Sequence, residues 1–445
     1  MSDVVEEFTR VAARHERCFW LDGGGAREWS RRRSIIGWLE PDDVSLTYDA
    51  ARREVTRHAS GRAEVVGDDP FAVLEAELAA GSPDDQWFGY FGYAARPDLP
   101  AESDPHLPDA VWMRPSHVRS FGERGGGDAG SRPDTPTVAE PLRHARREGS
   151  GSVAGGAPRV SPAMLPGVSG RDPASPPRAY TSAFAAVQEH LHAGNSYEVN
   201  LTHRLAVASD LAPAEAYLRL RAINPAPYAG YLQHDVPGAR AHLLSSSPER
   251  YALVTADREL ETKPIKGTTP RGATEAEDAA ARDRLATDPK FRSENLMIVD
   301  LLRNDLSVVC EVGSVAVPSL MQVESYASVH QLVSTVRGRL RGDVSTVAAL
   351  RSLFPAGSMT GAPKLRTMQI IGEVEDSPRG AYAGAFGWVA GDGRADLGVV
   401  IRSLMTTGDG TYLLGTGGGI TVDSDAAEEY AETRWKADRL LRAIG

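Results

Sequence analysis

A single lysine in a turn-rich stretch, Glu261–Gly272, is the first residue suited to chemistry. Pro264 fixes its own φ angle, and Gly267 allows close backbone approach or a positive φ, so Lys266 between them is held in one direction. Burial would cost its ammonium group solvation and lower its pKa, which would make the amine a nucleophile or base near neutral pH. An isolated loop lysine is usually solvated, so this interpretation depends on the rest of the chain.

Carboxylates in two predicted helices form a second candidate set. Glu294 lies near the start of an otherwise apolar helix, where its charge also suits the helix N-terminus. In the last helix, Glu432 and Lys436 are four residues apart and Glu429 precedes Glu432 by three, a spacing that usually indicates a surface ion-pair ladder. Carboxylates from different helices, without His or Cys companions, are also what Mg²⁺ prefers, together with anionic oxygens of a substrate.

Two features could bind an anion. The glycine run 415–419 matches neither a dinucleotide-binding fingerprint nor a P-loop, so we interpret it as bare backbone whose N–H groups form a nest for a carboxylate, without nucleotide specificity. Arg402 lies in an apolar predicted strand. A charge in such a strand is usually paired, and an anionic ligand is one candidate partner.

Three further polar residues have both a structural and a functional interpretation. Glu249 follows Pro248 at a strand end and is either a solvated turn residue or an acid that protonates a leaving hydroxyl. His330 alone would more often be a satisfied core histidine. Ser358 lies in a loop framed by Gly and Pro, after which a helix is expected to begin at residue 362 or 363.

The bulk composition indicates a globular protein. The chain has 445 residues, a formal net charge of −11, 41% hydrophobic and 24% charged residues, which argues against an extended nucleic-acid or anionic membrane surface. No run of about 18 apolar residues predicts a membrane span, and the acidic start of the chain does not resemble a signal peptide. The two cysteines, Cys18 and Cys310, cannot supply a disulfide framework, so a reducing, cytoplasmic location is expected.

Elements without a repeated βαβ rhythm favour an α+β fold with large antiparallel sheets. Residues 1–121 form a β-rich N-terminal region, 122–178 a Gly- and Pro-rich linker or insertion that is at least partly disordered apart from a short helix at about 137–147, and 179–445 the catalytic region. The main predicted helices lie at 181–192, with Thr181 as N-cap, and at 211–224, 274–287, 289–306 and 425–443. Strands are expected at 382–390, 396–406 and 411–415.

Five segments resemble, in this order, the chorismate-utilising enzymes, a family that includes anthranilate, aminodeoxychorismate, isochorismate and salicylate synthases. The segments are 247–249, 264–268, 294–301, 355–364 and 432–434. The resemblance is strong over residues 179–445 and weak over the first 121. It implies two large, mainly antiparallel sheets with surrounding helices that enclose one active site.

The resemblance also implies roles for individual residues. Glu294 and Glu432 resemble the family's Mg²⁺ ligands, with Glu429 behind them, and the metal would hold the ring carboxylate of chorismate. Glu249 resembles the acid that helps the C4 hydroxyl to leave. The expected contacts to the rest of the substrate are Arg402, Tyr382, the backbone of Gly417, Gly418 and Gly419, Lys436, His330, Ser358 and Thr268.

Two positions separate the subfamilies. Anthranilate synthases carry alanine where this chain has Lys266; a lysine is the mark of aminodeoxychorismate synthases, in which it attacks C2 before ammonia adds at C4. At the position of Glu198, isochorismate and salicylate synthases have a lysine that activates water, and amine-adding enzymes commonly have glutamine. The absence of that lysine weakens the water-adding alternative.

The resemblance therefore predicts a Mg²⁺-dependent aminodeoxychorismate synthase component I that feeds 4-aminobenzoate into folate or antibiotic biosynthesis. Neither Cys18 nor Cys310 lies in a glycine-flanked nucleophile elbow, so a partner glutamine amidotransferase is expected to supply the ammonia. The alternatives are an anthranilate synthase component I and a non-catalytic chorismate-binding subunit.

Overall fold

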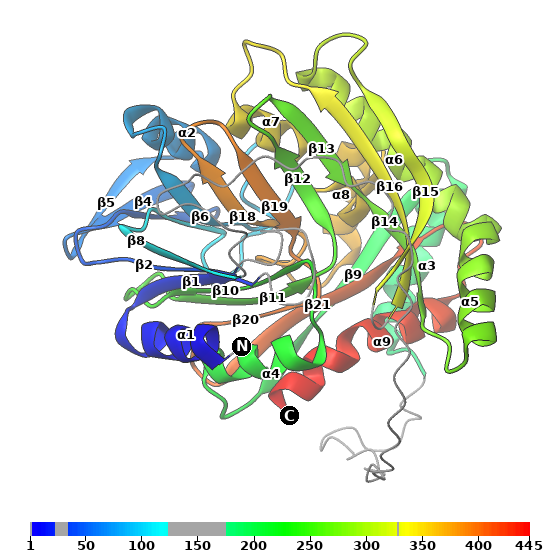
Figure 1. The fold of residues 1–445 in the computed structure, drawn as a ribbon. Coiled ribbons are helices and arrows are strands. Elements are labelled where there is room, and N and C mark those ends of the chain that lie inside the picture. The colour runs from blue at the N-terminus through cyan, green and yellow to red at the C-terminus, as the bar shows by residue number, and fades with distance from the viewer. Residues whose placement is uncertain (1, 23–33, 123–174, 327–328) are drawn as a thin grey trace, which may run out of the picture.

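The computed structural model describes residues 2–22, 34–122, 175–326 and 329–445. In these ranges two antiparallel sheets face each other, and helices cover their outer sides (Figure 1). The helices are α1 (Ser2–Arg14), α2 (Pro70–Ala80), α3 (Arg178–His192), α4 (Pro213–Ile223), α5 (Glu275–Thr287), α6 (Pro289–Val309), α7 (Thr346–Leu353), α8 (Lys364–Val374) and α9 (Ala426–Ile444), with a short 3₁₀ turn, η1 (Gly357–Met359).

The first sheet has nine strands in the described part of the chain. Their spatial order is β17 (Gly361–Ala362), β9 (Glu198–Ala208), β21 (Thr411–Ile420), β20 (Ser403–Thr406), β11 (Ala241–Ser247), β10 (Tyr228–His234), β1 (Arg17–Leu21), β2 (Ser34–Trp38) and β8 (His117–Phe121). Strands from the beginning, middle and end of the chain thus share one sheet.

The second sheet has twelve strands within the same ranges. They run in the order β14 (Ile265–Pro270), β16 (Val329–Arg339), β13 (Glu259–Lys263), β12 (Arg250–Val254), β19 (Ala395–Val399), β18 (Ala385–Ala390), β6 (Gln86–Phe91), β7 (Ala110–Met113), β3 (Ser45–Asp49), β4 (Glu54–Ala59) and β5 (Arg62–Gly67), and β15 (Ala316–Ser325) pairs with β16 outside this path. The α+β class with two antiparallel sheets is confirmed.

Aromatic side chains fill the space between the sheets. Phe19 of β1 stacks on Phe88 of β6 with ring centroids 3.9 Å apart, and both rings are fully buried. Gly398 lies against the ring of Tyr228, where a Cβ would come within 2.5 Å of Cγ, so this glycine permits the close approach of the two sheets. A second cluster packs α1, α4 and α9 beneath the first sheet (Figure 1).

Two of the places where the chain passes from one sheet to the other are neighbours in space. Residues 248–249 join β11 to β12, and residues 400–402 join β19 back to β20. The two crossings lie side by side, since the amide of Val399 donates to the carbonyl of Glu249 (2.9 Å) and that of Ser246 to the carbonyl of Arg402 (3.2 Å). This arrangement brings Glu249 and Arg402 to the same edge of the interior.

Some local predictions were wrong. The expected strand 396–406 is two strands in different sheets, and Arg402 is not in a strand but at the crossing, with φ of 50°. Helix α3 begins three residues before Thr181, which is not the N-cap; Pro177 occupies that position. The glycine run belongs to β21 and is a paired strand rather than a nest. The predicted linker lies almost wholly at 123–174, and the short helix at 137–147 entirely so, outside the described residues.

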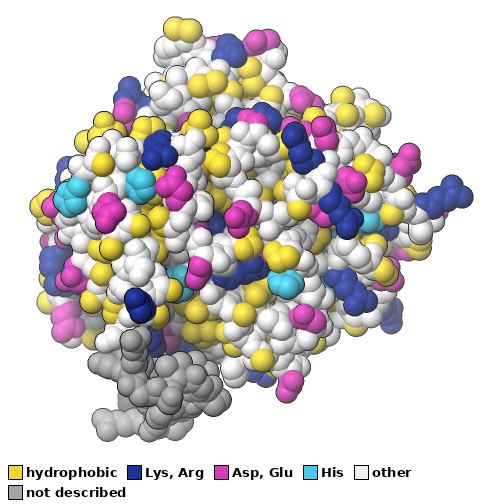
Figure 2. Space-filling view, turned by 180° about the vertical axis from the view of Figure 1, so that it is seen from behind, with side chains coloured by type: hydrophobic (Ala, Val, Ile, Leu, Met, Phe, Trp, Pro, Cys, Tyr) yellow, Lys and Arg dark blue, Asp and Glu magenta, His cyan; other side chains and the backbone are white. Residues whose placement is uncertain are grey.

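Other helix predictions were accurate. The N-cap of α5 is Thr274, α6 extends three residues beyond its predicted end, and α9 begins after an Asp425 cap. None of the described helices is long and apolar enough to cross a membrane. On the face shown in Figure 2, Lys and Arg side chains alternate with Asp, Glu and hydrophobic ones, without one large basic patch.

Candidate active site

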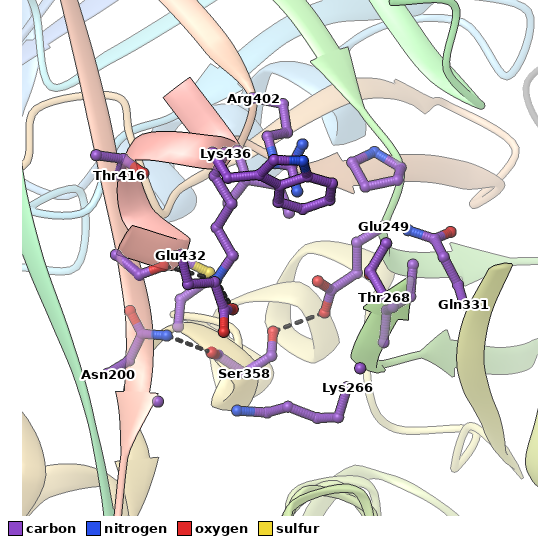
Figure 3. A pocket seen from close by; sticks show the side chains of 18 of the residues that line it. Asn200, Glu249, Lys266, Thr268, Gln331, Ser358, Arg402, Thr416, Glu432 and Lys436 are labelled. Atoms are coloured by element: carbon purple, nitrogen blue, oxygen red, sulfur yellow. Dashed lines mark hydrogen bonds and ion pairs between the residues drawn. The ribbon is translucent and has the colours of Figure 1, made fainter. Parts of the chain in front are cut away.

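A cavity of about 460 Å³ opens where the two sheets diverge, next to the crossings. Its size is that of a site for a small organic ligand. Helices α6 and α9, strands β14 and β21 and the turn η1 contribute its walls. Figure 3 shows Arg402 and Lys436 on one side, Lys266 on the opposite side, and Glu249 with Ser358 between them.

A bulge in β14 presents Lys266 to this cavity. Ile265 pairs with Val333 and Thr268 with Gln331, so one extra residue is accommodated between them, and Gly267 has φ of 89°. A bulge re-aims a side chain without breaking the sheet. Lys266 is 8% exposed, and its Nζ donates to Oε1 of Glu198 on β9 in a very short ion pair.

The protonation state of Lys266 differs from the prediction. Burial does act to lower its pKa, but the carboxylates of Glu198, Glu294 and Glu249 together outweigh burial, and the pKa lies above its ordinary value. Lys364 provides a contrast: its side chain is 13% exposed and pairs with Asp305 at 2.8 Å, and its pKa is lowered because burial outweighs that carboxylate. Lys266 therefore rests as an ammonium.

Glu249, unlike Lys266, has a pKa that shifts overall in favour of its neutral form, because of burial. It is 5% exposed, and burial raises its pKa to about 7, although a hydrogen bond from Ser358 and the nearby Lys266 oppose the rise. Ser358 Oγ donates to Glu249 Oε1 at 2.6 Å, and Asn200 Nδ2 donates to the Ser358 carbonyl at 3.1 Å (Figure 3). This chain of bonds fixes a carboxyl group that can donate a proton near neutral pH.

The three predicted metal-ligating carboxylates all line the cavity. Burial raises the pKa of Glu294 to about 7, and its Oε1 is buried without a hydrogen-bond partner. Glu429 accepts bonds from Lys290 (2.9 Å) and Ser424 (2.8 Å), while Glu432 pairs with Lys436 at 2.7 Å. In the described ranges, no three His, Cys, Asp or Glu side chains are grouped as a ready-made metal site.

The predicted anion contacts lie together on the other side. Arg402 is half-buried with its guanidinium 5.2 Å from the Trp435 ring centroid, and no carboxylate in the described parts of the chain forms an ion pair with it. Burial lowers its pKa to about 10, which leaves it charged at neutral pH. Tyr382 is buried beside it, and Gly415 makes room for that ring, since a Cβ there would lie 2.3 Å from Cγ. An unpaired arginine in a cavity favours an anionic ligand.

The glycines of β21 expose strand backbone to the cavity, because they have no side chains. Gly417 and Gly419 line it, and Lys436 Nζ donates to the Gly417 carbonyl at 2.8 Å. Gly418 is not among the lining residues, although a Cβ there would lie 3.1 Å from Glu429 Oε2. The strand thus offers backbone rather than side chains to a ligand.

His330 does not contact the cavity, so its prediction as a substrate contact disagrees with the structure. It is 1% exposed, with Nδ1 at 2.7 Å from Ser325 Oγ and Nε2 at 3.0 Å from Asp278 Oδ1. Successive residues of a strand face opposite sides, and its neighbour Gln331 lines the cavity with Thr268. His330 is the satisfied core histidine of the structural interpretation.

Sequence reasoning missed several cavity residues, among them Lys290, Asn200, Gln331 and Trp435. A signal existed for Lys290, since it precedes Glu294 by four residues and therefore shares its face of α6. The sequence reasoning also used Glu198 only to distinguish the subfamilies, whereas in the structure Glu198 is the ion-pair partner of Lys266. No local pattern predicts a partner 68 residues away.

Arg379 supports the site from behind, and its replacement by alanine is expected to destabilise the fold. Its buried guanidinium pairs with Glu375 and donates to the carbonyls of Met359 (2.7 Å) and Asn200 (2.8 Å). Removal would leave the buried Glu375 carboxylate without its ion-pair partner and, among the described residues, with hydrogen bonds from Thr202 only, at a cost of about 3–5 kcal/mol. Urea unfolding would measure the loss.

The matched control for this prediction is Arg366→Ala on α8. The side chain of Arg366 is 39% exposed, and its ion pair with Glu373 spans 3.6 Å, so its loss should change stability by less than about 1 kcal/mol. Equal effects of the two substitutions would show that the buried Arg379 network does not support the fold as described.

Comparison with known proteins identifies relatives along nearly the whole chain. A family model described as chorismate binding enzyme matches residues 16–442. The chain is 42% identical over 470 residues to an aminodeoxychorismate synthase of Streptomyces pristinaespiralis, a match that covers 99% of this chain and 64% of that protein. It is 36% identical over 434 residues to anthranilate synthase component 1 of Streptomyces coelicolor, covering 91% of this chain and 83% of that one.

Among solved structures, anthranilate synthase component I from Streptococcus pneumoniae has the same fold. The TM-score is 0.69 at 24% sequence identity, and the match covers 92% of each chain. The chain described here spans less than two thirds of the length of the aminodeoxychorismate synthase that it resembles.

Proposed function

The chain belongs to the family of chorismate-binding enzymes, and we propose that it aminates chorismate at C4 to give 4-amino-4-deoxychorismate, the reaction of aminodeoxychorismate synthase component I. The observation that carries this proposal is the buried Lys266 in the cavity wall together with a carboxyl group in the same cavity, Glu249, whose pKa is about 7. A nucleophile and an acid that line one cavity suit displacement of a hydroxyl from a small cyclic substrate.

The proposed first step joins Lys266 Nζ to C2 of chorismate. The ring double bonds shift, and the C4–O bond breaks with its electron pair on oxygen while Glu249 donates a proton, so that water leaves. Ammonia then adds at C4, the double bonds shift back, and the amine of Lys266 leaves C2. Glu249, now a carboxylate, takes the proton that the new C4 ammonium group releases. The covalent bond at C2 keeps ammonia from adding there.

Carboxylate recognition is proposed for the other side of the cavity. Arg402 and Tyr382, with Lys436 and the backbone of Gly417 and Gly419, would hold the enolpyruvyl carboxylate. Support comes from the charged guanidinium of Arg402, because a half-buried cation without an ion-pair partner is stabilised by an anionic ligand. Thr268 and Ser358, which line the same cavity, would contact the ring.

A Mg²⁺ ion fits the acidic side of the cavity. Glu294 carries a buried oxygen without a partner, Glu432 faces the same space from another helix, and oxygen donors without nitrogen or sulfur are what Mg²⁺ prefers. Glu294 and Glu432 would hold the ion, with Glu429 behind them, and the ion would neutralise the ring carboxylate of the substrate. Lys290 and Lys436 pair with two of these carboxylates and would have to yield to it.

Ammonia is proposed to come from a glutamine amidotransferase partner. Glutamine hydrolysis of that kind needs a reactive cysteine, and both cysteines are buried. Burial raises the pKa of the Cys310 thiol to about 11 and that of Cys18 further, so neither is an activated nucleophile. Free thiols also agree with the proposed reducing, cytoplasmic location.

A product assay tests the proposal. The protein would receive chorismate, Mg²⁺ and ammonium at alkaline pH, and mass spectrometry would identify the products before and after addition of an aminodeoxychorismate lyase. The expected product is an aminated chorismate that the lyase converts to 4-aminobenzoate. Anthranilate with pyruvate would instead establish the anthranilate synthase alternative, and chorismate binding without turnover, even with an amidotransferase present, would establish the non-catalytic one.

A further inference from the structure

We propose that Glu198 is the proton acceptor that converts Lys266 from an ammonium ion to the free amine, and thus a positioning residue that acts on the reaction through the lysine. The inference rests on the proposed function, because it concerns the nucleophile assigned there. It adds a residue from β9 that lies behind the cavity wall rather than in it, since Glu198 is not among the residues that line the cavity.

The contact between the two side chains is the first support. Glu198 is 1% exposed, and its Oε1 accepts a very short hydrogen bond from Lys266 Nζ. Its Oε2 is also buried and has no hydrogen-bond partner. A buried carboxylate with an unsatisfied oxygen is costly as an anion, and protonation relieves part of that cost. The geometry therefore suits a group that accepts a proton during the reaction.

The surrounding backbone keeps room for this pair. Glu198 pairs with Ala362 of β17 on one side, and the next residue pairs with Ile420 of β21 on the other. A Cβ at Gly419 would lie 2.2 Å from Glu198 Oε1 and 3.0 Å from Lys266 Nζ. The absence of a side chain at residue 419 is thus a condition for the contact.

The charges around Lys266 create the need for a base. Glu198, Glu294 and Glu249 outweigh burial and raise the lysine pKa, so the free amine is scarce at neutral pH. A nucleophile in that state needs an acceptor for its proton at the moment of attack. The charged residues that line the cavity with Lys266 or contact the lysine from behind are Glu198 of β9, Glu249 of the β11–β12 crossing, Arg402 of the β19–β20 crossing, Glu294 and Lys290 of α6, and Glu429, Glu432 and Lys436 of α9.

The proton balance closes over one cycle. An N–H bond of the Lys266 ammonium breaks, the proton forms an O–H bond on Glu198, and the freed electron pair on Nζ forms the bond to C2 of chorismate. When the amine leaves C2 after ammonia has added at C4, it takes the proton back from Glu198. The resting ammonium–carboxylate pair is restored without an external base.

This role has a signature in the pH dependence of the reaction. The resting pair and the reactive pair, free amine with carboxylic acid, contain the same number of protons, so their ratio does not change with pH as long as the pair keeps that number of protons. In Glu198→Gln the lysine can lose its proton only to solvent. The reactive form of the variant then increases about tenfold per pH unit until the pH reaches the lysine pKa.

The test compares kcat/KM of the wild type and of Glu198→Gln for chorismate, with ammonium as nitrogen source, from about pH 6 to about pH 9. The ratio of the two values at each pH cancels the dependence on Glu249 and on free ammonia, which both proteins share. We expect kcat/KM of the wild type to exceed that of Glu198→Gln about 10²-fold near pH 7, and this ratio should fall as pH rises. A ratio that does not change with pH, or a variant as fast as the wild type at pH 7, would overturn the proposal.

Glu198→Asp provides the second variant. It keeps a carboxylate that is one methylene shorter, so the reaction should slow while the ratio to the wild type stays constant with pH. A ratio for Glu198→Asp that falls with pH like that of the Gln variant would also refute a proton-accepting role. This variant keeps the test decisive where the neutral Gln side chain disturbs folding.

A measurement without chorismate separates this inference from the proposed function. The rate at which an amine-directed reagent labels Lys266 would be followed against pH by peptide mass spectrometry. In the wild type, proton transfer to Glu198 gives a small fraction of free amine that does not change with pH, so the labelling rate should be nearly constant around neutral pH. In Glu198→Gln the labelling rate should instead rise about tenfold per pH unit until the pH reaches the lysine pKa. Asp305→Asn, which breaks the Lys364 pair instead, should leave the Lys266 profile unchanged.

The outcomes are distinguishable. If the dependence of Lys266 labelling on pH is the same in Glu198→Gln as in the wild type, the proposal that Glu198 accepts the lysine proton is overturned, whatever the product assay finds. A shifted profile in a protein whose wild type aminates nothing would overturn the proposed function while the ion pair's control of the lysine stands.

Discussion

Lys266→Ala is expected to abolish the formation of 4-amino-4-deoxychorismate. The substitution removes the only atom proposed to bond to C2, and loss of a covalent nucleophile typically lowers the rate by roughly 10⁴- to 10⁶-fold. Without the adduct, C2 is open to ammonia, so any residual amination should move toward a 2-amino product. Mass spectrometry of the products from chorismate and ammonium would measure both effects.

Lys263→Ala is the matched control for this prediction. Lys263 precedes Lys266 by three residues, pairs with Glu324 at 3.1 Å, and is not among the residues that line the 460 Å³ cavity, so its loss should change the amination rate by less than about twofold. Wild-type protein incubated with chorismate in the absence of ammonia should also carry an adduct of chorismate less one water on the Lys266 peptide. Unchanged 4-amination in Lys266→Ala would refute the nucleophile assignment.

Glu249→Gln is expected to have the second largest effect on the reaction. Gln cannot donate a proton to the leaving hydroxyl, and loss of a general acid typically costs about 10²- to 10⁴-fold. In the wild type, Glu249 is protonated below its pKa of about 7, so its contribution to kcat/KM is present at lower pH and is lost as pH rises through about 7. The variant should lack that alkaline limb when free ammonia is held constant. A limb of equal size in both proteins would assign it to another group.

The same substitution should stabilise the fold at alkaline pH. The pKa of Glu249 is raised from 4.5 to about 7 on folding, so the folded state binds the proton more tightly, and stability is lost as pH rises between these values. A difference of about 2.5 units corresponds to roughly 3 kcal/mol as an upper value. Urea unfolding should show Glu249→Gln more stable than the wild type at about pH 8, with no difference below about pH 4.5.

A gain in stability together with a loss of activity would show that this position is held for chemistry rather than for the fold. Ser358, which donates to Glu249, can donate equally to the amide oxygen of Gln, so the local contact persists in the variant. A less stable variant at about pH 8 would contradict the burial that raises the pKa of Glu249.

Local patterns in the sequence determined much of the fold. The cap at Thr274 and the start of α9 after Asp425 follow from side chains that bond the free amides of a helix terminus, which is a contact over three residues. The antiparallel class followed from the order of the elements. The same short-range reasoning identified the glycines and prolines around Lys266, and Gly267 does adopt a positive φ.

Long-range packing decided what local patterns could not. An apolar run at 396–406 predicts one strand, yet residues 400–402 carry the chain from the second sheet to the first, and β19 and β20 pair with different neighbours. His330 and Gln331 are equally polar in sequence, and the register of β16 against β14 decides which of them faces the cavity. Side-chain orientation in a strand depends on its partner strand, which the sequence of the strand does not specify.

The protonation state of Lys266 is the clearest difference between what the sequence predicts and what the tertiary structure shows. From the sequence, burial alone predicted a lowered pKa for Lys266. The structure surrounds it with carboxylates from β9, α6 and the β11–β12 crossing, and their summed attraction outweighs desolvation. Electrostatic energy depends on distance through space, and the residues that set it lie far apart along the chain. The sequence therefore identified the reactive group, and only the tertiary structure determined its protonation state.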